Sequence, residues 1–306
     1  MFKDILLPLD GSKLSEASLD SARYIAKKLK SRITLLHIIE EDAPKEVHHE
    51  RHLTEPGEAE EYLKSVARRI IPPGSTPTRA ITSRIKVHVH RAPVNDVAAS
   101  ITRHAELEYK SSLIIISSHG KSGIRDFLFG NIAQQIVGRG KTPLLIIKPN
   151  SGPFKIKRVL VPLDPESGHD ITLSTAQSLG KIFEARIHLL SVVPTFSTLS
   201  GEQAAAGNLM PATAQILLDL REQNTSGDLA GHVDEFQKRN IQVQSHVLRG
   251  DPVREILHAV ELLNIDLIVL STHGKTGTSA FWARSVAPKL AQQTKTPILL
   301  MPLSET

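Results

Sequence analysis

The segment Lys3–Asp10 (KDILLPLD) opens the chain, and a segment of the same character returns as Lys157–Asp164 (KRVLVPLD). The step from the first segment to the second is 154 residues. A further segment, Ser117–Gly123 (SSHGKSG), returns after the same step as Ser271–Gly277 (STHGKTG). The chain is therefore a tandem duplication, and each half is about as long as one ordinary domain.

The composition fits two globular domains. The chain has 306 residues, of which 40% are hydrophobic, and this is enough apolar material for two independent cores. We expect domains at 1–150 and 155–306, with a linker at 151–153 (SGP). The sequence has no cysteine, which excludes disulfides and thiolate metal sites. No apolar run approaches the roughly 20 residues of a membrane helix, so we expect no membrane partner and a cytoplasmic location.

The charge pattern does not suggest a protein dedicated to nucleic acids. The net charge is +5 and the pI is about 9.3, but Lys and Arg are scattered along the chain. Aromatic residues, which could stack on bases, make up only 4%. Nucleic acid is therefore an unlikely partner, and the positive charge could equally favour a small polyanion such as a nucleotide.

The apolar pattern predicts the same fold in each half. Short apolar runs at 5–7 and 159–161 indicate strands buried on both faces. Helices with apolar residues at i, i+3, i+4 and i+7 follow at 22–29 and 176–183. A second apolar strand comes next without a hairpin signal, which predicts a parallel βαβ unit. The complete order, β-α-β-α-β-α-β-α-β, predicts an α/β fold of two tandem Rossmann-like doubly wound domains, each with a five-stranded parallel sheet.

The halves differ between their second and third strands. The first half has a helical pattern over 59–66, and Pro72-Pro73-Gly74 should end that helix. The second half instead has a Ser/Ala/Gly-rich stretch at 197–207. This stretch predicts a mobile lid or an external loop.

Two loops in each half point to a binding site. In doubly wound sheets, ligands bind beyond the carboxyl ends of the strands, where the winding reverses. Asp10 follows the first strand, and Ser117–Gly120 follows the fourth, with Gly130-Asn131 opening a helix nine residues later. Glycines let backbone N–H groups approach phosphates, and a helix N-terminus favours negative charge. The pattern suits a nucleotide, although the glycines could also serve turn geometry alone.

These residues carry a resemblance to the universal stress protein family, whose ATP-binding members have the pattern Gly-x2-Gly-x9-Gly-Ser/Thr after strand four and an Asp after strand one. The resemblance covers both halves nearly end to end and implies the adenine nucleotide alpha hydrolase-like fold. Half one reads Ser117-x2-Gly120-x9-Gly130-Asn131, and half two reads Ser271-x2-Gly274-x9-Arg284-Ser285. The nucleotide loop is thus better kept in half one and degenerate in half two.

The resemblance implies ATP as the cofactor, which Mg²⁺ can accompany. Asp10 would accept a hydrogen bond from the adenine or the ribose, and Asn131 would cap the helix and donate to phosphate. On the family pattern, the cofactor-binding residues of half one are Pro8, Leu9, Asp10 and Ile38 on the base side and Ser117, Gly120, Gly130, Asn131 and Ile132 on the phosphate side. In half two they are Asp164, Gly274 and Ser285.

Arg284 distinguishes the second half. It stands where the family has a glycine, so its side chain would block the approach of backbone to phosphate, and we favour this occlusion. The alternative is that the guanidinium swings out and binds phosphates in a bidentate manner. A further family feature, the turn Gly250-Asp251-Pro252 before the third helix, is kept in half two.

The histidines do not form an evident site in the sequence. His119 and His273 repeat, which favours a shared structural role. His48 and His52 would share a helix face beside His49 and could hold a metal, but no third ligand is evident. His88 and His90 alternate with valines and should lie on the less buried face of a strand. We assign no metal ligand and no catalytic residue.

No Ser-base-acid set, Walker loop or paired acidic cluster is visible in the sequence, so we expect at most slow ATP hydrolysis. The favoured function is an ATP-binding stress or regulatory protein that acts through its conformation and its choice of partner. The alternative is a tandem scaffold that binds no nucleotide, or a stress protein for another small ligand or a metal. The two halves should form an internal pseudo-dimer through the strands at 144–147 and 298–301, and a homodimer is left open.

Overall fold

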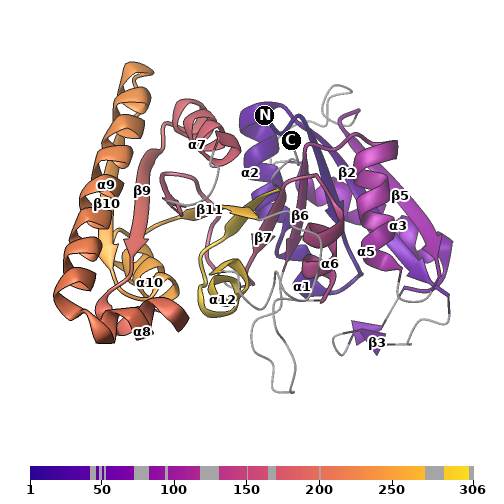
Figure 1. Ribbon diagram of the computed structural model, residues 1–306. Coiled ribbons are helices and arrows are strands. Elements are labelled where there is room, and N and C mark those ends of the chain that lie inside the picture. The colour runs from indigo at the N-terminus through magenta and orange to yellow at the C-terminus, as the bar shows by residue number, and fades with distance from the viewer. Residues whose placement is uncertain are drawn as a thin grey trace. The chain divides into compact units, whose positions relative to one another are not determined.

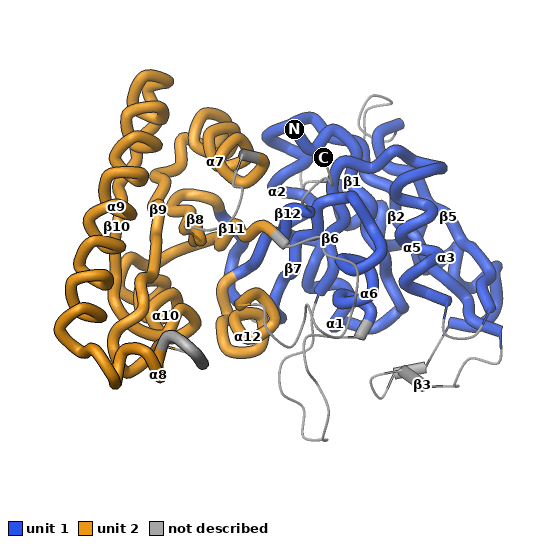
Figure 2. The backbone as a smooth tube through the Cα atoms, viewed as in Figure 1, with its two compact units in different colours: residues 1–155, 272–284, 297–306 blue, residues 156–271, 285–296 orange. Residues whose placement is uncertain are grey.

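The computed structural model describes residues 1–41, 46–47, 50–51, 53–71, 83–93, 96–117, 131–149, 151–164, 170–199, 201–272 and 286–302. The chain divides into two compact units (Figure 2). Unit 1 comprises residues 1–155, 272–284 and 297–306, and unit 2 comprises residues 156–271 and 285–296. The units differ from the expected domains, 1–150 and 155–306, because the last strand is grouped with unit 1. The domain boundaries themselves stay a prediction.

Unit 1 is built on a sheet with strand order β12-β7-β6-β1-β2-β5 (Figure 1). All neighbours except β12 and β7 run parallel. Its elements are β1 (Asp4–Pro8), α1 (Lys13–Glu16), α2 (Leu19–Leu29), β2 (Arg32–Glu40), the short pair β3 (Glu46–Val47) and β4 (Glu50–Arg51), α3 (Pro56–Ile70), β5 (Ile85–Ala92), α5 (Val97–Arg103), the π-helix η1 (His104–Glu108), β6 (Leu113–Ser117), α6 (Asn131–Arg139), β7 (Leu144–Ile147) and β12 (Ile298–Pro302).

Burial explains why these strands are nearly continuous apolar runs. Ile5, Leu6 and Leu7 of β1 are consecutive and at most 1% exposed, so both faces of the strand are covered. The four residues of β6 that precede Ser117 are buried in the same way. Helix α3, predicted from the pattern at 59–66, places Ala59, Leu63 and Val66 inward and packs on β5. The expected end of this helix at Pro72-Pro73-Gly74 lies outside the described residues.

The last strand of the second sequence half completes the sheet of unit 1. β12 pairs antiparallel with β7, in the register Ile298 with Ile146, Leu299 with Leu145 and Leu300 with Leu144. Six buried aliphatic side chains therefore meet across this pair. These are the two strands that the sequence predicts as the contact between the halves.

Unit 2 repeats the pattern with parallel strands in the order β10-β9-β8-β11. Apart from the short pair β3 and β4, each sequence half supplies five strands in the described residues, which agrees with the predicted fold class. The elements of unit 2 are β8 (Arg158–Pro162), α7 (Asp170–Phe183), β9 (Arg186–Val193), the short 3₁₀ helix η2 (Phe196–Thr198), α8 (Gly201–Leu209), α9 (Pro211–Lys238), β10 (Val243–Arg249), α10 (Pro252–Leu262), β11 (Leu267–Thr272) and α12 (Val286–Gln293).

The expectation of an external loop at 197–207 is wrong, because the described residues of this stretch lie mostly in η2 and helix α8. The lid stays a prediction. Alanine has the highest helix propensity, and the run 204–206 outweighs the glycines that suggested a loop. Gly207 also has a packing role, since a Cβ there would lie 3.3 Å from Cε2 of Phe196. Pro211 then stands in the first turn of α9, where a missing N–H costs nothing.

No helix in the described ranges combines the length and the apolar character that a membrane crossing requires. The 28-residue helix α9 carries charged residues along its length.

Candidate functional site

The chain reverses its winding between β1 and β6. From β1 it passes to β2 and β5 on one side, and β6 and β7 lie on the other side. Ile5 pairs with Leu113 and Leu6 with Ile114, so the carboxyl ends of the two strands are level. Asp10 and Ser117 therefore follow neighbouring strands at the switch point of the sheet, the place where ligands bind in this class of fold.

The turn after β1 holds Asp10 through a set of short hydrogen bonds. Its Oδ1 accepts from the backbone N–H of Ser12 at 2.9 Å and from the Ser12 hydroxyl at 2.7 Å. The Ser12 Oγ accepts in turn from the N–H of Ser15, which caps α1. Gly11 between them has φ +92°, a conformation that side chains rarely adopt. The carboxylate is thus positioned by the local backbone before any ligand arrives.

A buried histidine supports the same turn from β2. The His37 ring is fully buried, with Nδ1 2.7 Å from the carbonyl oxygen of Leu9 and Nε2 3.0 Å from that of Leu53. In the second half Ser191 stands at the equivalent position and donates its hydroxyl to the Leu163 carbonyl at 2.7 Å. Both halves therefore fix the peptide that precedes the aspartate, but only the first half uses an imidazole. His37 stands within an apolar run, and the sequence pattern did not indicate its role.

The predicted base-side residues lie where the sheet ends. Leu9 and Ile38 are 3% and 8% exposed, and Pro8 is half-buried. The Leu9 N–H donates to the Leu36 carbonyl at 2.8 Å, which joins the end of β1 to β2. Leu9 and Ile38 are therefore part of the core, and Pro8 offers the partly exposed apolar surface close in sequence to the Asp10 carboxylate.

The phosphate side is only partly described. Ser117 ends β6 and is half-buried, Asn131 begins α6, and Ile132 is 44% exposed. Gly120 and Gly130 lie outside the described residues, as do Gly274, Arg284 and Ser285 of the second half. His48, His49, His52, His119 and His273 also lie outside them.

The second half repeats the hydrogen bond that joins the end of its first strand to its second strand, just before Asp164. The Leu163 N–H donates to the Leu190 carbonyl at 2.8 Å, as Leu9 does to Leu36. Asp164 is exposed beyond this bond. The kept turn before the third helix also has a structural role, since Asp251 caps α10 by accepting from the Arg254 N–H at 3.0 Å.

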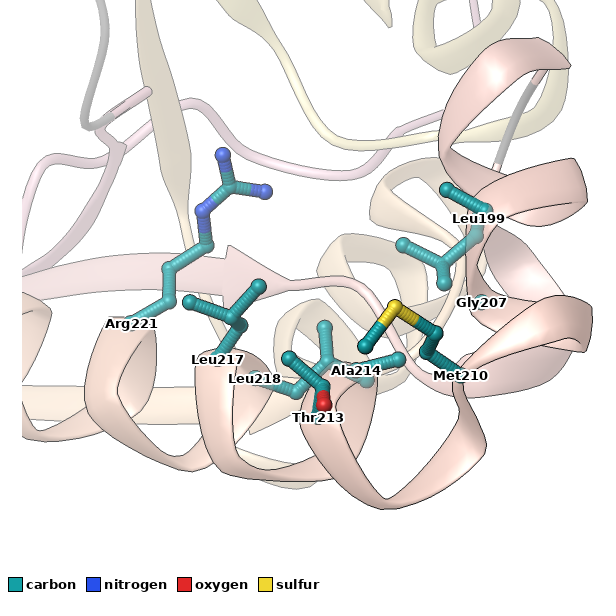
Figure 3. A pocket seen from close by; sticks show the side chains of 9 residues that line it. Leu199, Gly207, Met210, Thr213, Ala214, Leu217, Leu218 and Arg221 are labelled. Carbon is teal, nitrogen blue, oxygen red and sulfur yellow. The ribbon is translucent and has the colours of Figure 1, made fainter.

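A separate hollow of about 480 Å³ lies in unit 2 between α8 and the first turns of α9 (Figure 3). Its lining is mostly apolar, and several neighbouring large side chains, among them Met210 and Leu217 at 61% exposure each, face solvent. The lining residues are Leu199, Ala206, Gly207, Met210, Thr213, Ala214, Leu217, Leu218 and Arg221. Such a surface can accommodate a small apolar group. The sequence pattern, which predicted a loop in this region, did not predict a pocket.

The profile of the universal stress protein family matches residues 1–148 and again residues 155–302. The chain belongs to the universal stress protein family. A universal stress protein of Methanocaldococcus jannaschii is 25% identical over 150 residues, which cover 47% of this chain and 81% of the relative. The universal stress protein YxiE of Bacillus subtilis is 25% identical over 154 residues, covering 48% of this chain and all of the relative. The predicted tandem membership is confirmed.

Solved structures agree on the fold across the whole chain. A universal stress protein from Archaeoglobus fulgidus superposes with a TM-score of 0.62 at 20% identity and covers 99% of each chain. A Pseudomonas aeruginosa protein described as functionally unknown gives 0.63 at 17% identity, covering 98% of this chain and 92% of its own. A universal stress protein solved in complex with cAMP covers 48% of this chain, with a TM-score of 0.31.

Proposed function

We propose that this universal stress protein binds an adenine nucleotide, ATP in the first instance, at the switch point of its first half. The proposal rests above all on one observation: Asp10, held ready by Ser12, and Ser117 end neighbouring strands at that point. The base would lie against Pro8, Leu9 and Ile38. The triphosphate would extend over the loop after β6, which the sequence matches to the family's phosphate-binding pattern.

The nucleotide would serve as a signal that changes conformation and the choice of partner in the cytoplasm. Hydrolysis, with Mg²⁺ bound to the phosphates, would be slow at most. The second half would bind ATP weakly, because Arg284 replaces a glycine of the family pattern. We also propose that the halves work as an internal pseudo-dimer, which the pairing of β7 with β12 supports. X-ray scattering in solution tests this part, and two freely tumbling lobes would contradict it.

The sharpest test of the nucleotide site is Asp10→Asn. The variant keeps an Oδ1 that can accept from both donors of Ser12, so the turn should persist. It replaces the other carboxylate oxygen with an NH₂ group, which cannot accept from adenine or ribose. Calorimetric titration of ATP into protein freed of copurified nucleotide should show affinity at least about tenfold weaker, the equivalent of one hydrogen bond to a charged group.

Asp164→Asn is the matched control, because it makes the same change in the half with the degenerate loop. It should leave the main ATP affinity unchanged. A second variant, Gly130→Glu, introduces bulk and negative charge into the expected phosphate cradle and should abolish binding. If wild type, Asp10→Asn and Gly130→Glu have equal affinities for ATP, the proposed nucleotide site is wrong. The alternative, a tandem scaffold that binds no nucleotide, would then be favoured.

A further inference from the structure

Three histidines of unit 1 come together although they are separated in sequence. His88 and His90 lie two residues apart on β5, which is an edge strand of the unit 1 sheet. His104 stands at the junction of α5 and the π-helix η1 and is fully buried. One ring nitrogen of each residue lies within 4.8 Å of the others. The sequence predicted that His88 and His90 lie on the same face of a strand. The third histidine, His104, comes from a different element and was not predicted to join them.

The hydrogen bonds of His104 leave one ring nitrogen facing the other two rings. Its Nδ1 is 2.7 Å from the Ser100 carbonyl oxygen, so Nδ1 carries the proton and donates it. Its Nε2 therefore presents a lone pair, 3.2 Å from Nε2 of His88. A backbone carbonyl that fixes the outer nitrogen of an imidazole is the usual support of a metal-binding histidine.

A carboxylate completes the set. Oε2 of Glu108 lies 3.4 Å from Nε2 of His104, four residues along the π-helix. The wide turn of this helix is closed by the N–H of Tyr109, which donates to the His104 carbonyl at 2.9 Å. Rare π-helical turns occur frequently at functional sites.

We propose that His88, His90 and His104, with Glu108 as fourth ligand, bind a divalent transition metal ion, Zn²⁺ being the best match. Three imidazoles and one carboxylate form a donor set of borderline softness that suits tetrahedral Zn²⁺. With metal–nitrogen bonds of about 2.0–2.1 Å, tetrahedral ligand nitrogens are about 3.4 Å apart. The His88–His104 separation of 3.2 Å is close to this spacing. A ring nitrogen of His90 lies within 4.8 Å of both partner atoms, so it would have to approach them by no more than about 1.4 Å.

The charges around the site are compatible with a cation. Glu108 supplies a negative charge beside the three imidazoles, with its Oε2 3.4 Å from Nε2 of His104. Arg103 places a positive charge beside the site, with its Nη2 3.4 Å from Nε2 of His90 and 3.3 Å from Oγ of Ser100. Its side chain is exposed, so it can turn into solvent when an ion binds. Without metal, His88 would donate its Nε2–H to His104, and on binding it would move that proton to Nδ1.

The ion would tie the edge strand β5 to the end of α5. Co²⁺ is the probe of choice, because four-coordinate Co²⁺ absorbs visible light and can be competed off with Zn²⁺. Titration of nucleotide-free protein should give one Co²⁺ per chain with visible ligand-field bands. His88→Ala and His90→Ala, at half-exposed positions, should each weaken binding at least about tenfold, whereas Glu108→Gln should weaken it less.

Two controls separate this site from the other histidines. His258→Ala removes an exposed ring on α10 and should change nothing. The triple variant His48→Ala/His49→Ala/His52→Ala removes the polar histidine segment and should also bind as wild type does. His104→Gln removes the central ligand, and its far-UV circular dichroism reports whether it folds. Three outcomes would each overturn the proposal. They are Co²⁺ binding that is unchanged in His88→Ala and His90→Ala, Co²⁺ binding that is lost in the triple variant, and a wild-type protein that binds no Co²⁺ at micromolar concentration.

Discussion

Mild acid should destabilise unit 2 through one buried histidine, His188. The side chain lies on β9, is 3% exposed, and has its Nδ1 3.1 Å from Nε2 of His246 on β10. Its own Nε2 is buried and finds no hydrogen-bond partner in the described part of the chain. Burial, then His246, Arg186 and Arg158, lower the pKa of His188 from 6.5 to about 4.

The sign and size of the effect follow from that pKa. The unfolded chain takes up the proton near pH 6.5, but the folded chain resists it until about pH 4. The contribution of His188 to folding is therefore complete above pH 6.5 and is lost as the pH falls toward 4. At 1.36 kcal/mol for each pKa unit, the loss amounts to about 3 kcal/mol, a large part of the 5–15 kcal/mol that typically separates folded from unfolded domains.

The informative variant is His188→Thr, because Thr34 occupies the repeat-equivalent position of β2 and is buried there. The smaller side chain lowers the free energy of unfolding by a constant amount at every pH. It also removes the titration, so the difference between variant and wild type should shrink by about 3 kcal/mol between pH 7 and pH 4. Titrating groups that do not contact His188 cancel in this comparison, whereas His246, which lies within hydrogen-bond distance, is coupled to it.

Urea unfolding read by amide hydrogen exchange in peptides of β9 and β10 is the appropriate assay, because two units need not unfold in one step. His258→Thr is the matched control, since that ring is exposed on α10. The control should follow wild type at each pH. A difference between His188→Thr and wild type that stays constant from pH 7 to pH 4 would refute the assignment.

Three further substitutions test the packing of the turns and helices. Gly11→Ala should lower the free energy of unfolding by about 1–3 kcal/mol in urea titrations, because φ is +92° and a Cβ would lie 3.0 Å from Leu53; an unchanged midpoint would show that the turn relaxes freely. Gly180→Ala should cost about 1–3 kcal/mol, since its Cβ would lie 2.5 Å from Cγ2 of Ile241; a thermal midpoint equal to wild type would contradict this. Asp251→Ala removes the side-chain cap of α10 and should lower the free energy of unfolding by about 1 kcal/mol. Asp251→Asn can still cap the helix, so it should keep most of that stability.

The sequence by itself determined the fold and the place of the candidate nucleotide site. The repeat step of 154 residues indicated two halves of equal length, and unbroken apolar runs such as Leu113–Ile116 predicted strands covered on both faces. Parallel connections then carry Asp10 and Ser117 to the same edge of the sheet, because the carboxyl ends of parallel strands meet there. These conclusions depend on local pattern and on chain order, which the sequence contains.

The tertiary structure alone decided which distant side chains meet. No spacing rule joins His104 to His88 and His90, since the pairing depends on where the fold brings η1 beside the edge strand, and this π-helical turn has no sequence signature of its own. The same holds for His37, which lies on β2 and contacts the carbonyl of Leu9 just after the neighbouring strand β1. Helix α8 was not predicted because its glycines suggested a loop. The alanine run favours a helix, and Gly207 packs closely against Phe196. Contacts across elements depend on register and packing, which become fixed only when the whole core forms.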